Sequence, residues 1–184
     1  LEWLPHENIL FDGARLDARI HLDLAPGARF IGWETHCLGR PASQAPFLDG
    51  EVRFDLRVAR DGRPLLNDRQ HLSAVRQHAP AQLRGQPVLA TLLATPASAT
   101  LRDLLRDTLN ALTRPSTEGT VPLPGPGGVM HEVSWGTTLL DDLLVLRLLA
   151  PSTAAARTLL LTAWQTLRPD VIGRRACPPR IWAT

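Results

Sequence analysis

The chain has 184 residues, 44% of them hydrophobic and 21% charged, which argues against a disordered protein and allows a substantial core. The formal net charge of +2 is too small for a nucleic-acid footprint, and no apolar run is long enough to cross a membrane. The two cysteines, Cys37 and Cys177, do not form a disulfide framework. We therefore expect a protein of the cytoplasm that binds neither nucleic acid nor membrane.

The first regular element is predicted over residues 15–24, where polar and apolar residues alternate without interruption. A period of two is typical of a strand with one buried and one solvated face. The expected buried face carries Leu16, Ala18, Ile20, Leu22 and Leu24. The residues ahead of this run are already patterned and lack an initiator Met, so we expect the chain to be a piece of a longer protein.

Four turn dipeptides divide the first 75 residues into five strand-like runs. The turns are Asp12-Gly13, Pro26-Gly27, Asp49-Gly50 and Asp61-Gly62. Three of them are Asp-Gly, which is a strong signal for a tight turn. Glu51–Val58 alternates cleanly and Pro64–Leu72 reads as its return partner, while Gly32 predicts a bulge or a close approach of another group. We expect these five strands in antiparallel succession.

The hydrophobic period changes after residue 87. Val88–Thr95 is an apolar run between two prolines, which is typical of a buried strand. Leucines then recur at helical spacing from Leu101 to Leu112. We expect Ser98 to cap this helix and Pro115 to close it.

The last third of the chain predicts two strands and a second helix. The strands are expected over His131–Thr137 and Leu143–Ala150. A helical stripe runs from Ala156 to Leu167, with Ser152 as its N-cap and Pro169 as its end. The elements together predict a mainly β fold with two α-helices.

Signatures of catalysis are absent from the sequence. No serine lies in a nucleophile elbow, and the glycine-rich loop at 125–128 lacks the lysine of a phosphate-binding loop. His131-Glu132 is not followed by the second histidine of a zinc-binding helix. We therefore expect a protein that is not an enzyme and that works by docking.

Two other classes of function stay open. One is a fragment of a β-rich hydrolase whose other half holds the nucleophile, with His131, Glu132, Asp141 or Asp142 as acid or base groups. The other is a ligand-binding β-sandwich that uses Trp33 or Trp135 as a stacking platform, although such residues are more often part of the core.

One local pair of residues could bind a metal ion. Glu34 and His36 are two positions apart in a predicted strand, so their side chains share a face. A carboxylate and an imidazole suit a divalent cation such as Ni²⁺ or Zn²⁺. Two ligands alone bind weakly, which fits passage of an ion better than storage, and an ordinary solvated pair is the alternative. We expect no tightly bound cofactor.

Several blocks along the chain resemble the family of the urease accessory protein UreD, called UreH in some bacteria. The blocks occur in the family's order and span the whole chain. They are Leu1–Pro5, Phe11–Ala14, Gly32–Glu34, Leu38–Arg40, Asp61–Pro64, Ala90–Ala94 and Cys177–Trp182. The resemblance rests on the ordered set of blocks and not on any one of them.

This resemblance implies a β-helix-like stack of antiparallel and mixed strands with two helices. It implies a single UreD-like domain over residues 1–184, equivalent to the C-terminal two-thirds of a longer protein. It also implies a non-catalytic scaffold that binds apo-urease and recruits UreF and the GTPase UreG, so that Ni²⁺ reaches the urease active site. Glu34 and His36 are the candidate residues for a transient nickel path.

Overall fold

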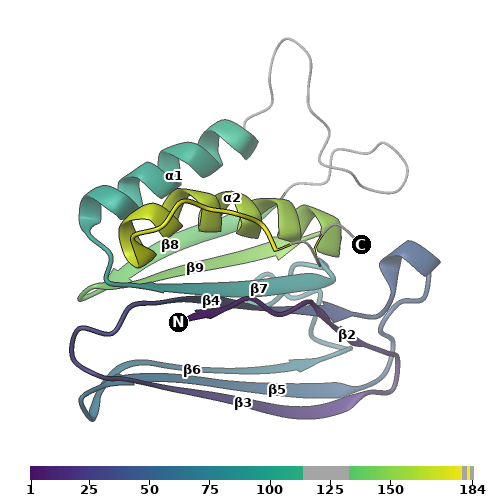
Figure 1. Cartoon of the computed structure of the whole chain (residues 1–184). Coiled ribbons are helices and arrows are strands. Elements are labelled where there is room, and N and C mark those ends of the chain that lie inside the picture. Colours follow the sequence, from purple (N-terminus) through teal and green to yellow (C-terminus); the bar gives the residue numbers. More distant parts are fainter. Residues whose placement is uncertain (114–132, 180–181, 183–184) are drawn as a thin grey trace.

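The computed structural model describes residues 1–113, 133–179 and 182, in which two β-sheets lie face to face and two helices cover the outer face of one sheet (Figure 1). The six strands of sheet A are β1 (Glu2–Trp3), β2 (Asn8–Leu10), β4 (Phe30–Leu38), β7 (Val88–Thr95), β8 (Ser134–Leu140) and β9 (Leu143–Ala150). The three strands of sheet B are β3 (Arg15–Leu24), β5 (Glu51–Arg60) and β6 (Arg63–Ser73). The helices are α1 (Ala99–Thr113) and α2 (Thr153–Ile172), with a short 3₁₀ helix at Pro41–Ser43. The predicted mainly β fold with two helices and mixed sheets is confirmed.

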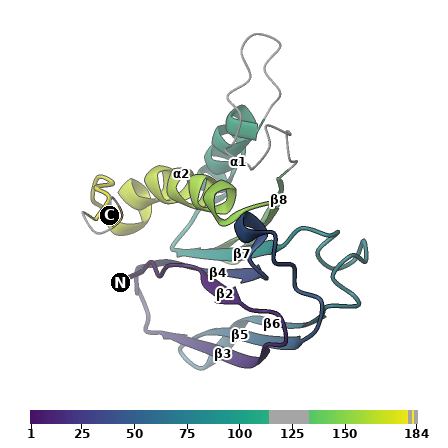
Figure 2. The same cartoon turned by 90° about the vertical axis from the view of Figure 1, so that its right-hand side faces the viewer.

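The first five strands wind back and forth between the two sheets. β1 and β2 lie in sheet A, β3 in sheet B, β4 in sheet A and β5 in sheet B. As a result β1 and β2 run parallel to β4, and β3 runs parallel to β5 along its whole length. This winding is the coil of a β-helix-like stack, and Figure 2 shows its two layers with the helices above them.

The expected antiparallel succession of these strands is wrong. Three of the four predicted turns carry the chain from one sheet to the other, so the strands on either side of them do not pair. Asp61-Gly62 alone among the four closes a hairpin, between β5 and β6. Asp61 has φ 48° and Gly62 has φ 72°, the pair of positive values that the tightest hairpin turn requires.

The centre of sheet A is buried on both faces. All residues of β7 are buried, as predicted, because the helices cover one face and sheet B covers the other. Gly32 on β4 allows a close approach, since a Cβ there would lie 2.7 Å from the backbone oxygen of Trp3 and 2.7 Å from the ring of Phe30. β9 has the predicted bounds. β8 begins at Ser134 and ends at Leu140, and the first two residues of the predicted strand lie outside the described part of the chain.

Both helices begin at the predicted caps. The hydroxyl of Ser98 accepts a hydrogen bond from the backbone N–H of Leu101 at 3.1 Å, and Ser152 accepts from Ala155 at 3.2 Å. Residue 115, the predicted end of α1, lies outside the described residues, and α1 is described to Thr113.

The predicted end of α2 at Pro169 is wrong, because the helix continues through Pro169 to Ile172. Val171 in this last turn is fully buried, and Arg29 Nη1 donates to its carbonyl oxygen at 3.1 Å, so packing and capping hold the turn in place. Gly173, with φ 77°, then ends the helix in the left-handed conformation.

An ion pair ties the first strand to α2. Both carboxylate oxygens of Glu2 accept from the Arg168 guanidinium at 2.8 Å, and the indole N–H of Trp164 also donates to Glu2 at 2.8 Å. The hydrogen bonds from Arg168, and to a smaller extent the one from Trp164, hold the pKa of Glu2 below its usual value. Partial burial of the carboxylate acts in the opposite direction. Among the described residues, neither helix is long and apolar enough to span a membrane.

The inner face of β3 is less covered than that of its neighbour. The strand alternates as predicted, but Leu16, Ala18, Ile20 and Leu22 are only half-buried. On β5, which lies next to it in sheet B, the inward-facing residues Val52, Phe54, Leu56 and Val58 are all buried. β3 is therefore an edge strand whose apolar face is partly open.

Candidate functional site

Glu34 and His36 lie together on the inner face of β4, as their spacing predicts. His36 Nε2 is 3.1 Å from Glu34 Oε2. The side chain of His36 is 3% exposed and that of Glu34 is 13% exposed, so this is an interior pair between the two sheets and not a solvated one. The shared face is confirmed, whereas a metal-binding role stays a prediction.

Groups from two other strands fix the imidazole. With the proton on Nε2, that nitrogen donates to Glu34, and Nδ1 accepts from the side-chain amide of Asn8 on β2 at 3.5 Å. The ring also stacks on Phe54 of β5, with centroids 3.9 Å apart and planes 23° apart. His36 therefore connects sheet A to sheet B, and its orientation depends on residues far apart in the sequence.

A row of polar side chains crosses sheet A from this pair. In the strand register Glu34 of β4 is opposite Thr91 of β7, and Thr91 is opposite Arg147 of β9. Cross-strand neighbours point to the same side of a sheet, so all three side chains face sheet B. Arg147 Nη2 then donates to Asp68 Oδ2 of β6 at 2.8 Å, and the row thereby reaches sheet B.

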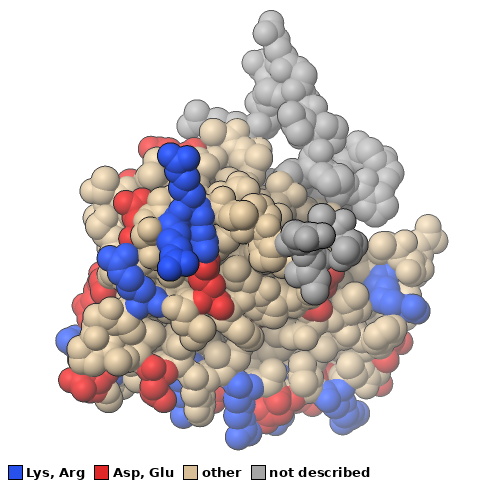
Figure 3. All heavy atoms as spheres, viewed as in Figure 1, with Lys and Arg blue, Asp and Glu red and all other residues tan. Residues whose placement is uncertain are grey.

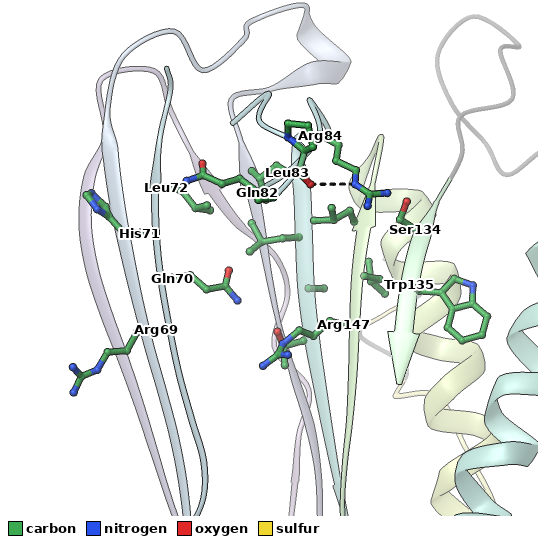
Figure 4. Close-up of a pocket in the computed structure, with 17 residues that line it drawn as sticks. Arg69, Gln70, His71, Leu72, Gln82, Leu83, Arg84, Ser134, Trp135 and Arg147 are labelled. Atoms are coloured by element: carbon green, nitrogen blue, oxygen red, sulfur yellow. Dashed lines mark hydrogen bonds between the residues drawn. The ribbon is translucent and has the colours of Figure 1, made fainter. Parts of the chain in front are cut away.

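Two hollows lie along this row. A largely apolar hollow of about 250 Å³ lies beside β1 and β3, and Glu34 and Thr91 are among its lining residues. A cleft of about 600 Å³ opens on the opposite side, between β6 and the pair β8–β9, and Thr91 and Arg147 line it. Figure 4 shows this cleft, with Gln70 and Arg147 pointing into the space between the sheets and His71 and Arg69 pointing away from it. Thr91 lines both hollows.

The arrangement suits a weak and transient contact with a divalent cation. Among the described residues no cluster of three or more His, Cys, Asp and Glu side chains could hold a metal ion. Glu34 Oε2 and His36 Nε2, which lie 3.1 Å apart, offer one oxygen and one nitrogen ligand. A cation bound by both atoms would have two protein ligands and would complete its shell with water, which favours release over storage.

Two of the acid or base groups expected of a hydrolase fragment, Asp141 and Asp142, lie beside arginine side chains. Asp142 accepts from Arg60, and its backbone oxygen accepts from Ala97 at 2.8 Å. Asp141 lies in the turn between β8 and β9 and is 3.6 Å from Arg63. Each carboxylate therefore has an arginine partner. His131 and Glu132 lie outside the described residues.

The expected stacking tryptophans also contribute to packing. Trp33 is buried, and its indole N–H donates to the backbone oxygen of Pro5 at 3.0 Å. Its ring packs beside that of Trp182, with the two ring centroids 5.8 Å apart. Trp135 packs against the core on the helix side, and its indole N–H is 3.4 Å from the hydroxyl oxygen of Thr113.

Sequence reasoning missed Asn8, Thr91, Arg147 and Asp68. Thr91 lies within an apolar run and Arg147 interrupts another, so the only local signal is a polar residue inside an otherwise buried strand. Their alignment with Glu34 depends on the pairing of strands that are distant in the chain.

Comparison with known proteins gives the class of molecule in which this site occurs. The chain matches the family described as UreD urease accessory protein over residues 1–183. The match identifies an accessory protein of urease, and the chain belongs to the UreD family. The family is named for an accessory role, which agrees with the expectation that the chain is not an enzyme.

Similar curated proteins carry the same name, Urease accessory protein UreD. The protein from Pseudomonas putida (strain W619) is 38% identical over 184 residues, that from Hahella chejuensis 36% over 186, and that from Alkalilimnicola ehrlichii 40% over 185. Each alignment covers 100% of this chain but only 57–58% of the relative. The chain therefore spans somewhat more than half the length of the relatives it matches.

Proposed function

We propose that this chain is part of a non-catalytic scaffold for urease maturation, which binds apo-urease and recruits UreF and the GTPase UreG in the cytoplasm. The observation that carries the proposal is the family match across residues 1–183, with relatives at 34–40% identity along the whole chain. The two-sheet body offers broad surfaces for docking.

The cargo of this scaffold is Ni²⁺, which passes between the two sheets and contacts Glu34 and His36 on the way. The polar row from Glu34 through Thr91 to Arg147 supports this route, because its residues line the two hollows on opposite sides of the stack. An ion in transit needs groups that hold it weakly at successive points, and an interior pair of two ligands meets that condition. No tightly bound cofactor is part of the proposal.

The outer surface of sheet B offers a matched control for this route. Glu51 and His71 form a second carboxylate–imidazole pair, with 2.6 Å between Oε1 and Nε2, but both side chains are substantially exposed. The two pairs share their chemistry and differ in position. Glu34→Gln and His36→Gln should therefore lower nickel delivery, whereas Glu51→Gln and His71→Gln should leave it unchanged.

The test uses the full-length protein that contains this chain, co-expressed with urease, UreF and UreG. Co-purification measures assembly, and the nickel content of the isolated urease measures delivery. We expect all four variants to co-purify with their partners, and the two interior variants to yield urease with severalfold less nickel. Failure of the unaltered protein to co-purify with any partner would refute the scaffold, and equal nickel content in all four variants would refute the route through Glu34 and His36.

A further inference from the structure

The polar row ends at the cleft with an ion pair that joins the two sheets. Arg147 of β9 donates from Nη2 to Asp68 Oδ2 of β6 at 2.8 Å, and Gln70 Nε2 donates to the same oxygen at 3.2 Å. The side chain of Arg147 is 48% exposed and that of Asp68 is 19% exposed. Figure 4 shows Arg147 and Gln70 reaching into the space between the sheets. The pair therefore closes the row on the side where the cleft lies.

Arg147 is also the outermost side chain of the row. In the strand register it is opposite Gly136 of β8, which is an edge strand of sheet A within the described residues. A Cβ added at Gly136 would meet no atom within 4 Å beyond its chain neighbours. The guanidinium therefore has open space beside it, into which it can turn when it leaves Asp68.

The two charges of this pair have opposite effects on a cation in the row. Arginine keeps its positive charge at any physiological pH, and an arginine in a narrow passage excludes cations. Asp68 neutralises that charge while the two residues are paired, and its oxygens suit a divalent cation once they part. An ion that moves from Glu34 past Thr91 toward the cleft thus meets a barrier that one partner creates and the other lowers.

We propose that Arg147 and Asp68 form a gate for divalent cations between the polar row and the cleft, a proposal that rests on the nickel route described above. While the two residues are paired, the guanidinium closes the passage. A divalent cation competes with Arg147 for the Asp68 carboxylate, because its charge is twice that of the guanidinium. Arg147 then turns toward the open space beside Gly136, and the ion passes into the cleft.

The outer face of sheet B offers a matched control for this gate. Arg57 and Asp55 form an ion pair at 2.7 Å with side chains 44% and 18% exposed, so its length and burial resemble those of the gate. In Figure 3 charged side chains of both signs lie along the lower border of the molecule, where Figure 1 places sheet B. Arg57 and Asp55 lie outside the space between the sheets, so loss of either charge should not affect passage of an ion.

Nickel delivery at limiting nickel tests the gate in the full-length protein, co-expressed with urease, UreF and UreG. The nickel content of the isolated urease measures passage, while co-purification and thermal unfolding measure assembly and folding. Arg147→Gln removes the barrier and should raise the nickel content about twofold or more. Asp68→Asn leaves the barrier without its neutralising charge and should lower the nickel content severalfold. Arg57→Gln and Asp55→Asn should leave it unchanged.

The opposite signs separate a gate from a purely structural ion pair. Both gate variants break the same contact, so a structural role would lower Tm and nickel content alike in the two. A change in the same direction in both variants, or an unchanged nickel content in Asp68→Asn, would overturn the gate. The second criterion holds even if Arg147→Gln does not assemble, because Asp68→Asn keeps Arg147 in place.

Glu34→Gln in the same experiment separates failure of the gate from failure of the route. If Glu34→Gln delivers as much nickel as the unaltered protein, the route is refuted, and the gate with it. If Glu34→Gln lowers delivery but Arg147→Gln and Asp68→Asn have no opposite effects, the gate alone is overturned.

Discussion

Replacing Glu2 isolates the contact that ties the first strand to α2. Glu2→Gln removes the charge that pairs with Arg168 but keeps an oxygen that can accept from Trp164. Glu2→Ala removes the acceptor for both Arg168 and Trp164. Asp107→Asn, an exposed carboxylate on α1, serves as the control for loss of a charge without loss of a partner.

The size of the effect follows from the burial of the groups involved. The Glu2 and Arg168 side chains are 23% and 14% exposed, so solvent screens the pair only in part. Loss of a charge-assisted bond of this kind costs about 2 kcal/mol. Trp164 is fully buried, and an indole N–H left there without an acceptor adds about 1–3 kcal/mol. We therefore expect Glu2→Gln to cost about 2 kcal/mol and Glu2→Ala about 4 kcal/mol of unfolding free energy.

Thermal and urea unfolding measure these losses. For a chain of this size the expected decreases in Tm are about 4–8 °C for Glu2→Gln and about 8–16 °C for Glu2→Ala. The pKa of Glu2 is lower in the folded state than in the unfolded chain. The stabilisation is therefore complete above the unfolded pKa of about 4.3 and is lost as the pH falls through the lower folded pKa.

The pH dependence gives the sharper test. The stability difference between the unaltered protein and Glu2→Gln should be constant near neutral pH and should shrink progressively below about pH 4. Asp107→Asn should change Tm little at any pH. If Glu2→Gln and Glu2→Ala were both as stable as the control variant, or if the Glu2→Gln difference did not change in acid, the reasoning would be refuted.

Three further predictions concern the helices and the cysteines. Leu105→Ala, at a fully buried position of α1, should lower the free energy of unfolding in urea by about 3 kcal/mol. Leu104→Ala, on the exposed side of the same helix, should cost almost nothing, and equal effects would contradict the packing of α1. Burial raises the pKa of Cys37 to about 11, so a maleimide at pH 8 should modify exposed Cys177 and leave Cys37 intact, as peptide mass spectrometry would show. Ser152→Ala should cost about 1 kcal/mol by loss of the N-cap of α2, and an unchanged urea midpoint would contradict this role.

Local patterns predicted the elements of this fold well. The period of two located β5, the unbroken apolar run located β7, and the helical stripes with their serine caps located the starts of α1 and α2. These signals succeed because each depends on residues within a few positions of one another. The predicted helix end at Pro169 is wrong for the same reason. The contacts that stabilise the last turn of α2 come from the core and from Arg29, which is far away in the sequence.

The same local patterns could not predict which strands pair with each other. A turn such as Pro26-Gly27 is compatible with a hairpin and equally with a crossing between sheets, and only packing of the apolar faces decides between them. The candidate site shows the same division. The shared face of Glu34 and His36 followed from their spacing, but Thr91 and Arg147 became neighbours of this pair only through strand register.

The row from Glu34 to Arg147 makes β4, β7 and β9 intolerant of changes in length. Deletion or insertion of one residue within β7 would rotate the following side chains to the opposite face, so that leucine or alanine would replace Thr91 between the sheets. Gaps between homologous sequences should therefore fall in the connections, such as residues 39–50. The alignments with the relatives, 184 to 190 positions long for these 184 residues, leave room for only a few inserted positions in such connections.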